Sequence, residues 1–323
     1  MKVRLSAPGK TFLLGEYAVL GGSPALLVST GPRFSVELEL GQSGSCEGIH
    51  PNSPAGRWVR QQNLLFQNAS VRFVDPHGGK GGLGGSSAQF LGVYTWSILA
   101  ETPMTEWPSA LNPQKLWQAF RSVAWDGQGL PPSGADVMAQ FMGGITQFQS
   151  QPFNLQSPRW PFADLSFSLF RTNKKVATHH HLGSMQGTHF GELKPDLDRA
   201  LAAFHHGNAQ VFIASLQSYG RQLMDMGLVD DEVIPLVEKL RVVPEVQAVK
   251  GCGALGADIL LALHHPADKG AVVSAAEKLG LAYEASVGDL DQGLKLEVET
   301  ASIPVAGSRY QGAVFSRDEG DHL

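Results

Sequence analysis

A dense run of glycines stands before two serines in the first third of the chain. Six of the eight residues 78–85 are glycine, and Ser86, Ser87 and Ala88 follow directly. Glycine lets the backbone approach a ligand closely and adopts positive φ without strain. An apolar helical pattern begins after the run, and a helix N-terminus presents unpaired N–H groups and the positive end of its dipole. The run therefore predicts a cradle for the phosphates of a nucleotide, and the alternative interpretation is a flexible surface loop.

Three further segments combine glycine or proline with side chains that can do chemistry. They are residues 6–19 (SAPGKTFLLGEYAV), 132–136 (PSGAD) and 250–258 (KGCGALGAD). We expect the first and the last of these, like the glycine run, to be loops. The glycine run does not have the spacing of a Walker loop, and it lacks the βαβ unit and the acidic residue of a dinucleotide-binding fingerprint.

Composition narrows the class of protein. The chain has 323 residues, 43% of them hydrophobic and 17% charged, which predicts an ordered protein with a sizeable core. A net charge of -5 argues against nucleic acid as the main partner. Two distant cysteines, Cys46 and Cys252, do not form a disulfide framework and fit a reducing cytosol. No apolar run is long enough to span a membrane, so we expect a soluble, cytoplasmic protein with no membrane partner.

Histidines 179–181 are the densest cluster of possible metal ligands. Adjacent side chains of a strand point to opposite faces, so three in a row cannot readily bind one ion. The sequence also lacks an H-E-x-x-H or C-x-x-C spacing. We therefore do not predict a structural metal site.

Hydrophobic periodicity indicates two units. Residues 25–28 could form a buried strand, and alternation over residues 34–40 predicts a half-buried one. Helices are predicted at 86–99 and from Asn112, which can cap a helix whose first turn holds Pro113. Proline and polar residues at 151–163 mark a domain boundary. Beyond it, strands and helices, closed by an alternating strand at 294–298, predict an α+β sandwich.

The segments taken together resemble the GHMP kinases, the superfamily named for galactokinase, homoserine kinase, mevalonate kinase and phosphomevalonate kinase. The first segment is similar to P-G-K…G-E-[HY]-A-V and the glycine run to G-L-G-S-S-A, with one extra small residue before the serines. The resemblance implies an α+β fold of two domains. The first, residues 1–160, would bind the nucleotide and have helices over its sheet; the second, residues 161–323, would be a ferredoxin-like α/β sandwich.

The resemblance also implies roles for individual residues, with ATP and Mg²⁺ as cofactors. Asp136 would be the catalytic base, and Lys10 would stabilise charge on the transferring phosphoryl group. The phosphate-binding residues would be Gly82, Leu83, Gly84, Gly85, Ser86, Ser87 and Ala88. The metal ligands would be Ser86 and Asp126. The substrate-binding residues would be Glu16, Tyr17, Ser133, Gly134, Gly253 and Ala254.

Each of these side chains also has an ordinary structural interpretation. Ser86 could simply cap a helix, and Ser133-x-x-Asp136 is a capping-box pattern. Lys10 could be a solvated surface charge, as most lysines are. Asp126 could be a loop aspartate and Glu16 a cap of a local turn. Three cations at 171, 174 and 175 could meet an anionic acceptor or line a strand edge in water.

The resemblance implies transfer of the γ-phosphoryl group of ATP to a small molecule. The first segment is most similar to that of phosphomevalonate kinase and, next, of mevalonate kinase, so phosphomevalonate or mevalonate is the expected acceptor, in isoprenoid biosynthesis. A sugar or sugar-phosphate kinase is the alternative, and a mevalonate diphosphate decarboxylase fits less well. The third segment has fewer glycines than usual, with Leu255 in it, which leaves open a non-catalytic nucleotide-binding homologue. We expect a monomer or homodimer.

Overall fold

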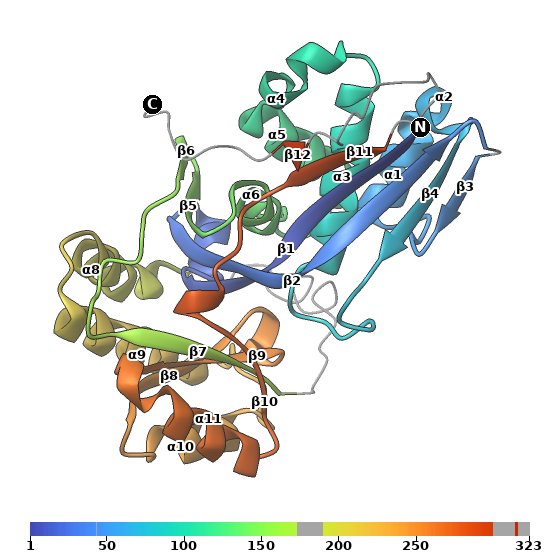
Figure 1. Ribbon diagram of the computed structural model, residues 1–323. Helices are drawn as coiled ribbons and strands as arrows, with labels where there is room; N and C mark the ends of the chain where they lie inside the picture. Colours follow the sequence, from blue (N-terminus) through green and yellow to red (C-terminus); the bar gives the residue numbers. More distant parts are fainter. Residues whose placement is uncertain (43, 173–189, 300–313, 316–323) are drawn as a thin grey trace.

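Two β-sheets, each with its own helices, build the molecule (Figure 1). The structure is a computed structural model, and it describes residues 1–42, 44–172, 190–299 and 314–315. The histidines at 179–181 and the lysines at 174 and 175 lie outside the described residues. No helix in the described ranges combines the length and the apolar character that a membrane span requires.

The first sheet is built mainly from the N-terminal half of the chain. Its strand order is β12-β11-β1-β2-β4-β3, and β5 pairs with both β2 and β6. Its strands are β1 (Lys2–Leu14), β2 (Ala25–Leu40), β3 (Ser45–Glu47), β4 (Ala69–Val74), β5 (Ile145–Ser150), β6 (Phe153–Gln156), β11 (Lys295–Glu299) and β12 (Val314–Phe315). The helices that precede residue 143 are α1 (Pro54–Gln61), α2 (Asn63–Phe66), α3 (Gly85–Leu99), α4 (Trp107–Ala110), α5 (Pro113–Ala124) and α6 (Ala135–Met142).

Strand β1 corrects the expectation that residues 6–19 form a loop. The strand runs to Leu14, between β11 and β2, and every residue from Leu5 onward is buried. A strand buried on both faces has no polar–apolar alternation, so periodicity does not reveal it. The Pro8-Gly9 pair sits at an irregularity in the pairing of β1 with β2. Strand bulges accommodate such residues.

Other local signals were read correctly. The strands expected at 25–28 and 34–40 are the two ends of the long strand β2, and Phe34, Val36 and Leu38 are buried. The helix expected at 86–99 is α3. Asn112 caps α5 by accepting a hydrogen bond from the Lys115 amide at 2.9 Å. Helix α1 was missed within a segment rich in glycine, serine and proline, although a serine caps it and a proline begins it.

The second sheet has the order β10-β7-β9-β8, and all its pairings are antiparallel. Its strands are β7 (Ser166–Arg171), β8 (Val246–Cys252), β9 (Ile259–His264) and β10 (Ala282–Ser286). Its helices are α8 (Lys194–His205), α9 (Ala209–Asp225), α10 (Ile234–Arg241) and α11 (Lys269–Lys278). Numbered along the chain, the strands lie across the sheet in the order 4-1-3-2, with helices in the first and last connections, which is the ferredoxin-like arrangement. The expected α+β fold with a ferredoxin-like sandwich is confirmed.

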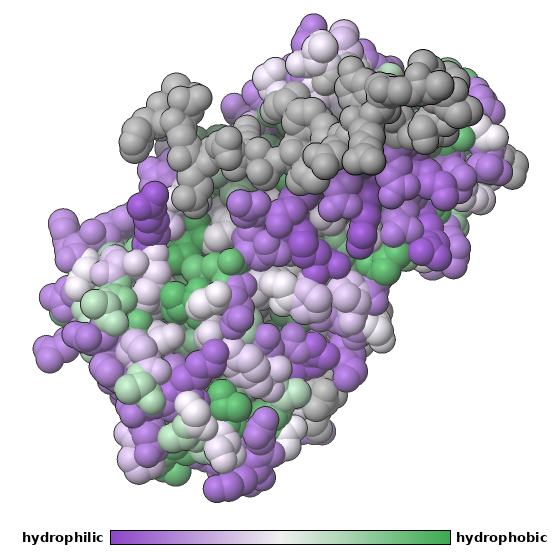
Figure 2. Space-filling model, viewed as in Figure 1, coloured by the Kyte–Doolittle hydropathy of each residue, from purple (hydrophilic) through white to green (hydrophobic). Residues whose placement is uncertain are grey.

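The end of the chain returns to the first sheet. The alternating strand at 294–298 was expected to complete the second unit, but as β11 it pairs with β1. Arg33 holds the returning segment by donating to the Asp291 carboxylate at 2.8 Å and to the carbonyls of Gln292 and Gly293. The returning backbone packs so closely on Gly143 that a Cβ there would lie 2.0 Å from the Gly293 nitrogen. In Figure 2 the visible surface is mostly hydrophilic, and an apolar area lies at the waist between the sheets.

Candidate active site

The glycine run leads directly into helix α3, as a phosphate cradle requires. Gly84 precedes the helix with a φ of 89°, and no side chain caps the helix N-terminus. The first N–H groups of a helix have no partner within the helix, so here they are available to an anion. Ser86 is exposed, whereas the buried Ser87 hydroxyl donates to the Gly84 carbonyl at 2.9 Å. Of the two serines, Ser86 is therefore the one placed to reach a ligand.

Lys10 and Asp136 come together although 126 positions separate them. The Lys10 ammonium lies 3.3 Å from the Asp136 carboxylate, and their side chains are 8% and 37% exposed. Lys10 belongs to β1, and its amide donates to the Leu83 carbonyl of the glycine run at 3.0 Å. The pair therefore lies beside the run, with the lysine largely buried and the carboxylate open to solvent. Lys10 is not the solvated surface charge of the ordinary interpretation.

The capping-box interpretation of Asp136 is not realised. Helix α6 begins after Gly134, which has a φ of 76°, and no side chain caps it. The Ser133 hydroxyl accepts from the amide of Ala135 at 3.2 Å, within the turn before the helix. The Asp136 carboxylate, in the first helical turn, instead faces the Lys10 ammonium. A carboxylate in this position is also stabilised by the positive end of the helix dipole.

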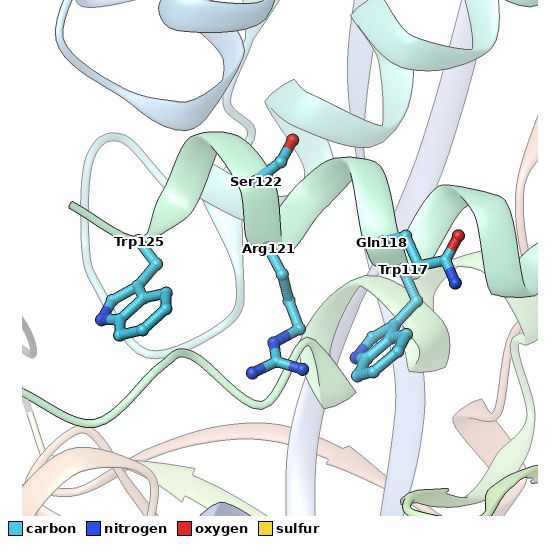
Figure 3. Close-up of a pocket in the computed structure, with 5 residues that line it drawn as sticks. All are labelled: Trp117, Gln118, Arg121, Ser122 and Trp125. Atoms are coloured by element: carbon cyan, nitrogen blue, oxygen red, sulfur yellow. The ribbon is translucent and has the colours of Figure 1, made fainter. Parts of the chain in front are cut away.

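Trp117 of α5 fixes the turn that starts α6. Its indole N–H donates to the Ser133 carbonyl at 2.8 Å, and a Cβ on Gly134 would lie 2.6 Å from its ring. The same ring contacts the Arg121 guanidinium, 4.9 Å from the ring centroid. Figure 3 shows Trp117, Arg121 and Trp125 on one side of α5, where they line an open surface cavity together with Gln118 and Ser122.

Glu16 and Tyr17 lie in buried contacts with the second half of the chain. Glu16 forms an ion pair with Lys250 of β8, and both side chains are at least 95% buried, with exposures of 5% and 0%. The Tyr17 hydroxyl accepts from the Leu255 amide at 2.7 Å. Tyr17 and Leu255 are the non-glycine residues with positive φ in the described chain, at 65° and 52°. Two strained turns are thus joined by one hydrogen bond, which links the first segment to the third.

Burial raises the pKa values of two acidic groups beside Lys250. Burial raises the pKa of Glu16, and the nearby Lys250 ammonium opposes that rise. Burial likewise raises the pKa of the Cys252 thiol to about 11, against the opposing effect of Lys250. Lys250 satisfies its ammonium with Glu16, the Gly251 carbonyl at 3.1 Å and the Cys252 sulfur at 3.5 Å. These contacts form a buried polar cluster, in which Cys252 remains a neutral thiol at neutral pH.

The third segment touches the glycine run through Asp258. A Cβ on Gly82 would lie 2.2 Å from the Asp258 Cβ, so a side chain at position 82 has no room there. Gly253 has a φ of 86°, and a Cβ built on it would meet no atom within 4 Å. Ala254 begins the short turn Ala254–Gly256 that carries Leu255. The segment therefore faces the glycine run from the second sheet, as a site between the two sheets requires.

Asp126 is not brought to the other candidates by any described interaction. It is exposed, and its carboxylate accepts from the amide of Gln128 at 3.0 Å. Within the described ranges, no cluster of three or more acidic, histidine or cysteine side chains is placed to hold a metal ion. Mg²⁺ usually keeps several waters and binds one or two protein groups plus substrate phosphates. The exposed Ser86 hydroxyl, at the end of the glycine run, fits that mode of binding.

Gln140 is a further residue of the candidate site, and the sequence analysis missed it. It lies on α6, completely buried, and its side-chain amide donates to the Pro8 carbonyl at 2.9 Å and to the Gly84 carbonyl at 3.0 Å. It follows Asp136 by four positions, which places both on one face of the helix. A polar residue at that spacing, within an otherwise apolar helix, was the available signal.

Comparison with known proteins shows the fold. No protein-family model and no curated protein sequence matches the chain. Solved structures do match. Lactococcus lactis galactokinase complexed with galactose is 14% identical, with a TM-score of 0.72, over 91% of this chain and 94% of that one. A Lin0012 protein from Listeria innocua is 17% identical, with a TM-score of 0.71, over 92% and 99% of the two chains.

Streptococcus pneumoniae phosphomevalonate kinase in complex with phosphomevalonate and AMPPNP is 16% identical, with a TM-score of 0.69, over 88% of this chain and 98% of that one. Structures of mevalonate kinase and homoserine kinase also match. The chain therefore has the fold of the GHMP kinases, as its sequence motifs indicated. At these identities the likeness concerns the fold and leaves the substrate open.

Proposed function

We propose that this chain is an ATP-dependent small-molecule kinase that transfers the γ-phosphoryl group of ATP to phosphomevalonate or mevalonate. The observation that carries the proposal is the Lys10–Asp136 pair, 3.3 Å apart, beside the glycine run that starts α3. A cation, a carboxylate and a set of backbone N–H groups are the elements that phosphoryl transfer needs, because its catalysis is mainly positioning and charge stabilisation. The specific resemblance of residues 8–19 to the isoprenoid kinases supports the choice of acceptor.

Each residue has a defined part in this proposal. The N–H groups at the start of α3 and the backbone of residues 82–85 would hold the phosphates of ATP. Lys10 would stabilise the negative charge of the transferring group and, at 3.3 Å, hold the Asp136 carboxylate beside it. Asp136 would orient the acceptor and take its proton. Mg²⁺, held in part by Ser86, would neutralise phosphate charge when bound.

The importance of Asp136 depends on the acceptor. A hydroxyl acceptor such as that of mevalonate must lose a proton during transfer, so the carboxylate would act as its base. The phosphate of phosphomevalonate is already ionised near neutral pH, so Asp136 would then orient it or shape the local charge. Activity of an Asp136 variant therefore reports on the class of acceptor as well as on the mechanism.

A sugar or sugar-phosphate kinase is the second candidate. The galactokinase match, with its TM-score of 0.72, favours it as much as the phosphomevalonate kinase match favours the first. A third candidate is a nucleotide-binding homologue without turnover. Its support is the third segment. Leu255 there has a positive φ, which glycine adopts more easily, and its amide donates to the Tyr17 hydroxyl.

One panel of acceptors separates the three. Purified protein with ATP and Mg²⁺ is incubated with mevalonate, phosphomevalonate, hexoses and hexose phosphates, and ADP release is followed by a coupled assay. ADP release with either mevalonate compound alone supports the proposal. Release with a sugar alone replaces it with the second candidate. Retained nucleotide binding without ADP release from any acceptor supports the non-catalytic homologue.

A further inference from the structure

We propose that Gln140 is a positioning residue for phosphoryl transfer, whose side-chain amide holds the glycine run in place against the Lys10–Asp136 pair. The proposal rests on the proposed kinase function, because the geometry it protects is that of the phosphate cradle relative to the base. Gln140 would not touch the substrate. It would set the distance between the groups that do.

One amide joins three segments that are far apart in the sequence. Gln140 lies on α6, and its Nε2 donates to the carbonyl of Pro8 in β1 at 2.9 Å and to that of Gly84 at 3.0 Å. Pro8 stands two residues before Lys10, Gly84 precedes the first residue of α3, and Asp136 lies one turn earlier on α6. The lysine, the base and the phosphate cradle are therefore each tied to the same side-chain nitrogen.

The Gln140 amide and the aliphatic part of the Lys10 side chain both pack closely against Gly84. A Cβ built on Gly84 would lie 2.9 Å from the Gln140 Nε2 and 3.0 Å from the Lys10 Cγ. Gly84 also has a φ of 89°, so its conformation suits glycine alone. A small shift of either side chain would move the residue from which α3 begins, and with it the N–H groups that face the phosphates.

The bond to Gly84 is not needed to satisfy the Gly84 carbonyl. That oxygen already accepts from the Ala88 amide at 2.9 Å and from the Ser87 hydroxyl at 2.9 Å. Gln140 is nevertheless retained fully buried, and its Oε1 has no hydrogen-bond partner among the described residues. A buried polar atom without a partner costs stability that an apolar side chain would avoid. The hydrogen bond from Gln140 to Gly84 is therefore better explained by a role in positioning the glycine run than by a contribution to stability.

The test compares two glutamines with the same bonding. Gln140→Met removes both donors with little change in volume. Gln149→Met is the matched control, because the Gln149 Nε2 on β5 also donates to two carbonyls, those of Gly22 at 3.0 Å and Gln151 at 3.1 Å. Misplacement of reacting groups by about 1 Å costs about 100-fold in rate. We expect kcat to fall by about that factor in Gln140→Met, with KM for ATP changed by no more than about threefold.

Amide hydrogen exchange supplies a readout that is independent of turnover. In Gln140→Met the amides of Lys10 and Ala88, which donate to the Leu83 and Gly84 carbonyls of the glycine run, should exchange faster than in the wild-type protein, and in Gln149→Met they should not. A structural role alone would lower the thermal stability of Gln140→Met and leave its kcat near the wild-type value. If Gln140→Met fails to fold, Gln140→Asn takes its place, because its shorter amide cannot reach both carbonyls.

Two results would overturn the inference. One is a kcat for Gln140→Met within about threefold of the wild-type value, and the other is an equal loss in Gln149→Met. If the wild-type protein releases no ADP with any acceptor, the proposed function fails on its own. Exchange at the Lys10 and Ala88 amides then still decides whether Gln140 holds the glycine run, and unchanged exchange in Gln140→Met rejects it.

Discussion

Glu16→Gln distinguishes a buried structural ion pair from a substrate contact. Glu16 pairs with Lys250, whose side chain is 0% exposed and completes its bonding with the Gly251 carbonyl and the Cys252 sulfur. The substitution keeps the shape of the side chain and removes its charge, which leaves an uncompensated ammonium in the interior. Breaking a buried pair on one side costs about 3–5 kcal/mol, a large part of the roughly 5–15 kcal/mol by which proteins are stable.

The second half of the experiment removes both charges. Glu16→Leu combined with Lys250→Met replaces the pair by apolar side chains, and such replacements are often neutral or stabilising. We therefore expect the double variant to be more stable than Glu16→Gln, with strong coupling between the two positions. Glu39→Gln is the control, because Glu39 lies 3.8 Å from Lys2 with side-chain exposures of 47% and 61%, and an exposed pair of this kind is worth at most about 1 kcal/mol.

Urea unfolding of the four proteins measures these differences as changes in midpoint at constant slope. ADP release with the preferred acceptor is measured in parallel. The reasoning is refuted if Glu16→Gln unfolds within about 1 kcal/mol of the wild-type protein while the KM for the acceptor rises strongly. That result would make Glu16 a substrate-binding residue, as the sequence resemblance implied.

Three shorter predictions address the site itself. Asp136→Asn should lower turnover of an alcohol acceptor, measured as ADP release, by about 10²–10⁴-fold, the usual contribution of a general base. Asp164→Asn is the control, because the Asp164 side chain is 90% exposed. An unchanged rate in Asp136→Asn removes Asp136 from the mechanism. Gly82→Ala should weaken ATP binding, measured by calorimetry, at least about tenfold, because the new Cβ would lie 2.2 Å from the Asp258 Cβ. Gly79→Ala should not weaken it, because Gly79 also has a positive φ but a Cβ there would meet open space. Equal effects of the two substitutions would contradict the close packing at Gly82. Burial lowers the pKa of His77 from 6.5, with Arg171 adding to the effect and the Pro32 carbonyl and Asp75 opposing it, while Glu284 lies 4.0 Å away. The unfolded chain then binds the proton more readily, so His77 contributes to stability above pH 6.5 and that contribution is lost as the pH falls. Melting temperatures between about pH 7.5 and 5.5 should therefore fall less in His77→Gln than in the wild-type protein, and parallel curves would reject this.

Local signals in the sequence were sufficient to predict elements that show a hydrophobic pattern or a capping residue. The alternation at 34–40, the helix at 86–99 and the cap at Asn112 depend on residues within a few positions of each other, and all three are present. Strand β1 was misread because it is buried on both faces, and its position between β11 and β2 depends on residues near the other end of the chain.

The sequence by itself determined which residues could do the chemistry: the motifs name Lys10, Asp136 and the glycine run, and the resemblance predicted the fold. Only the tertiary structure decided which of them meet. It brings Lys10 within 3.3 Å of Asp136, buries Glu16 against Lys250 and places Gln140 between Pro8 and Gly84. These contacts join residues 56 to 234 positions apart. Side-chain type and local spacing carry no information about such distances, because they arise from how strands and helices pack into one core.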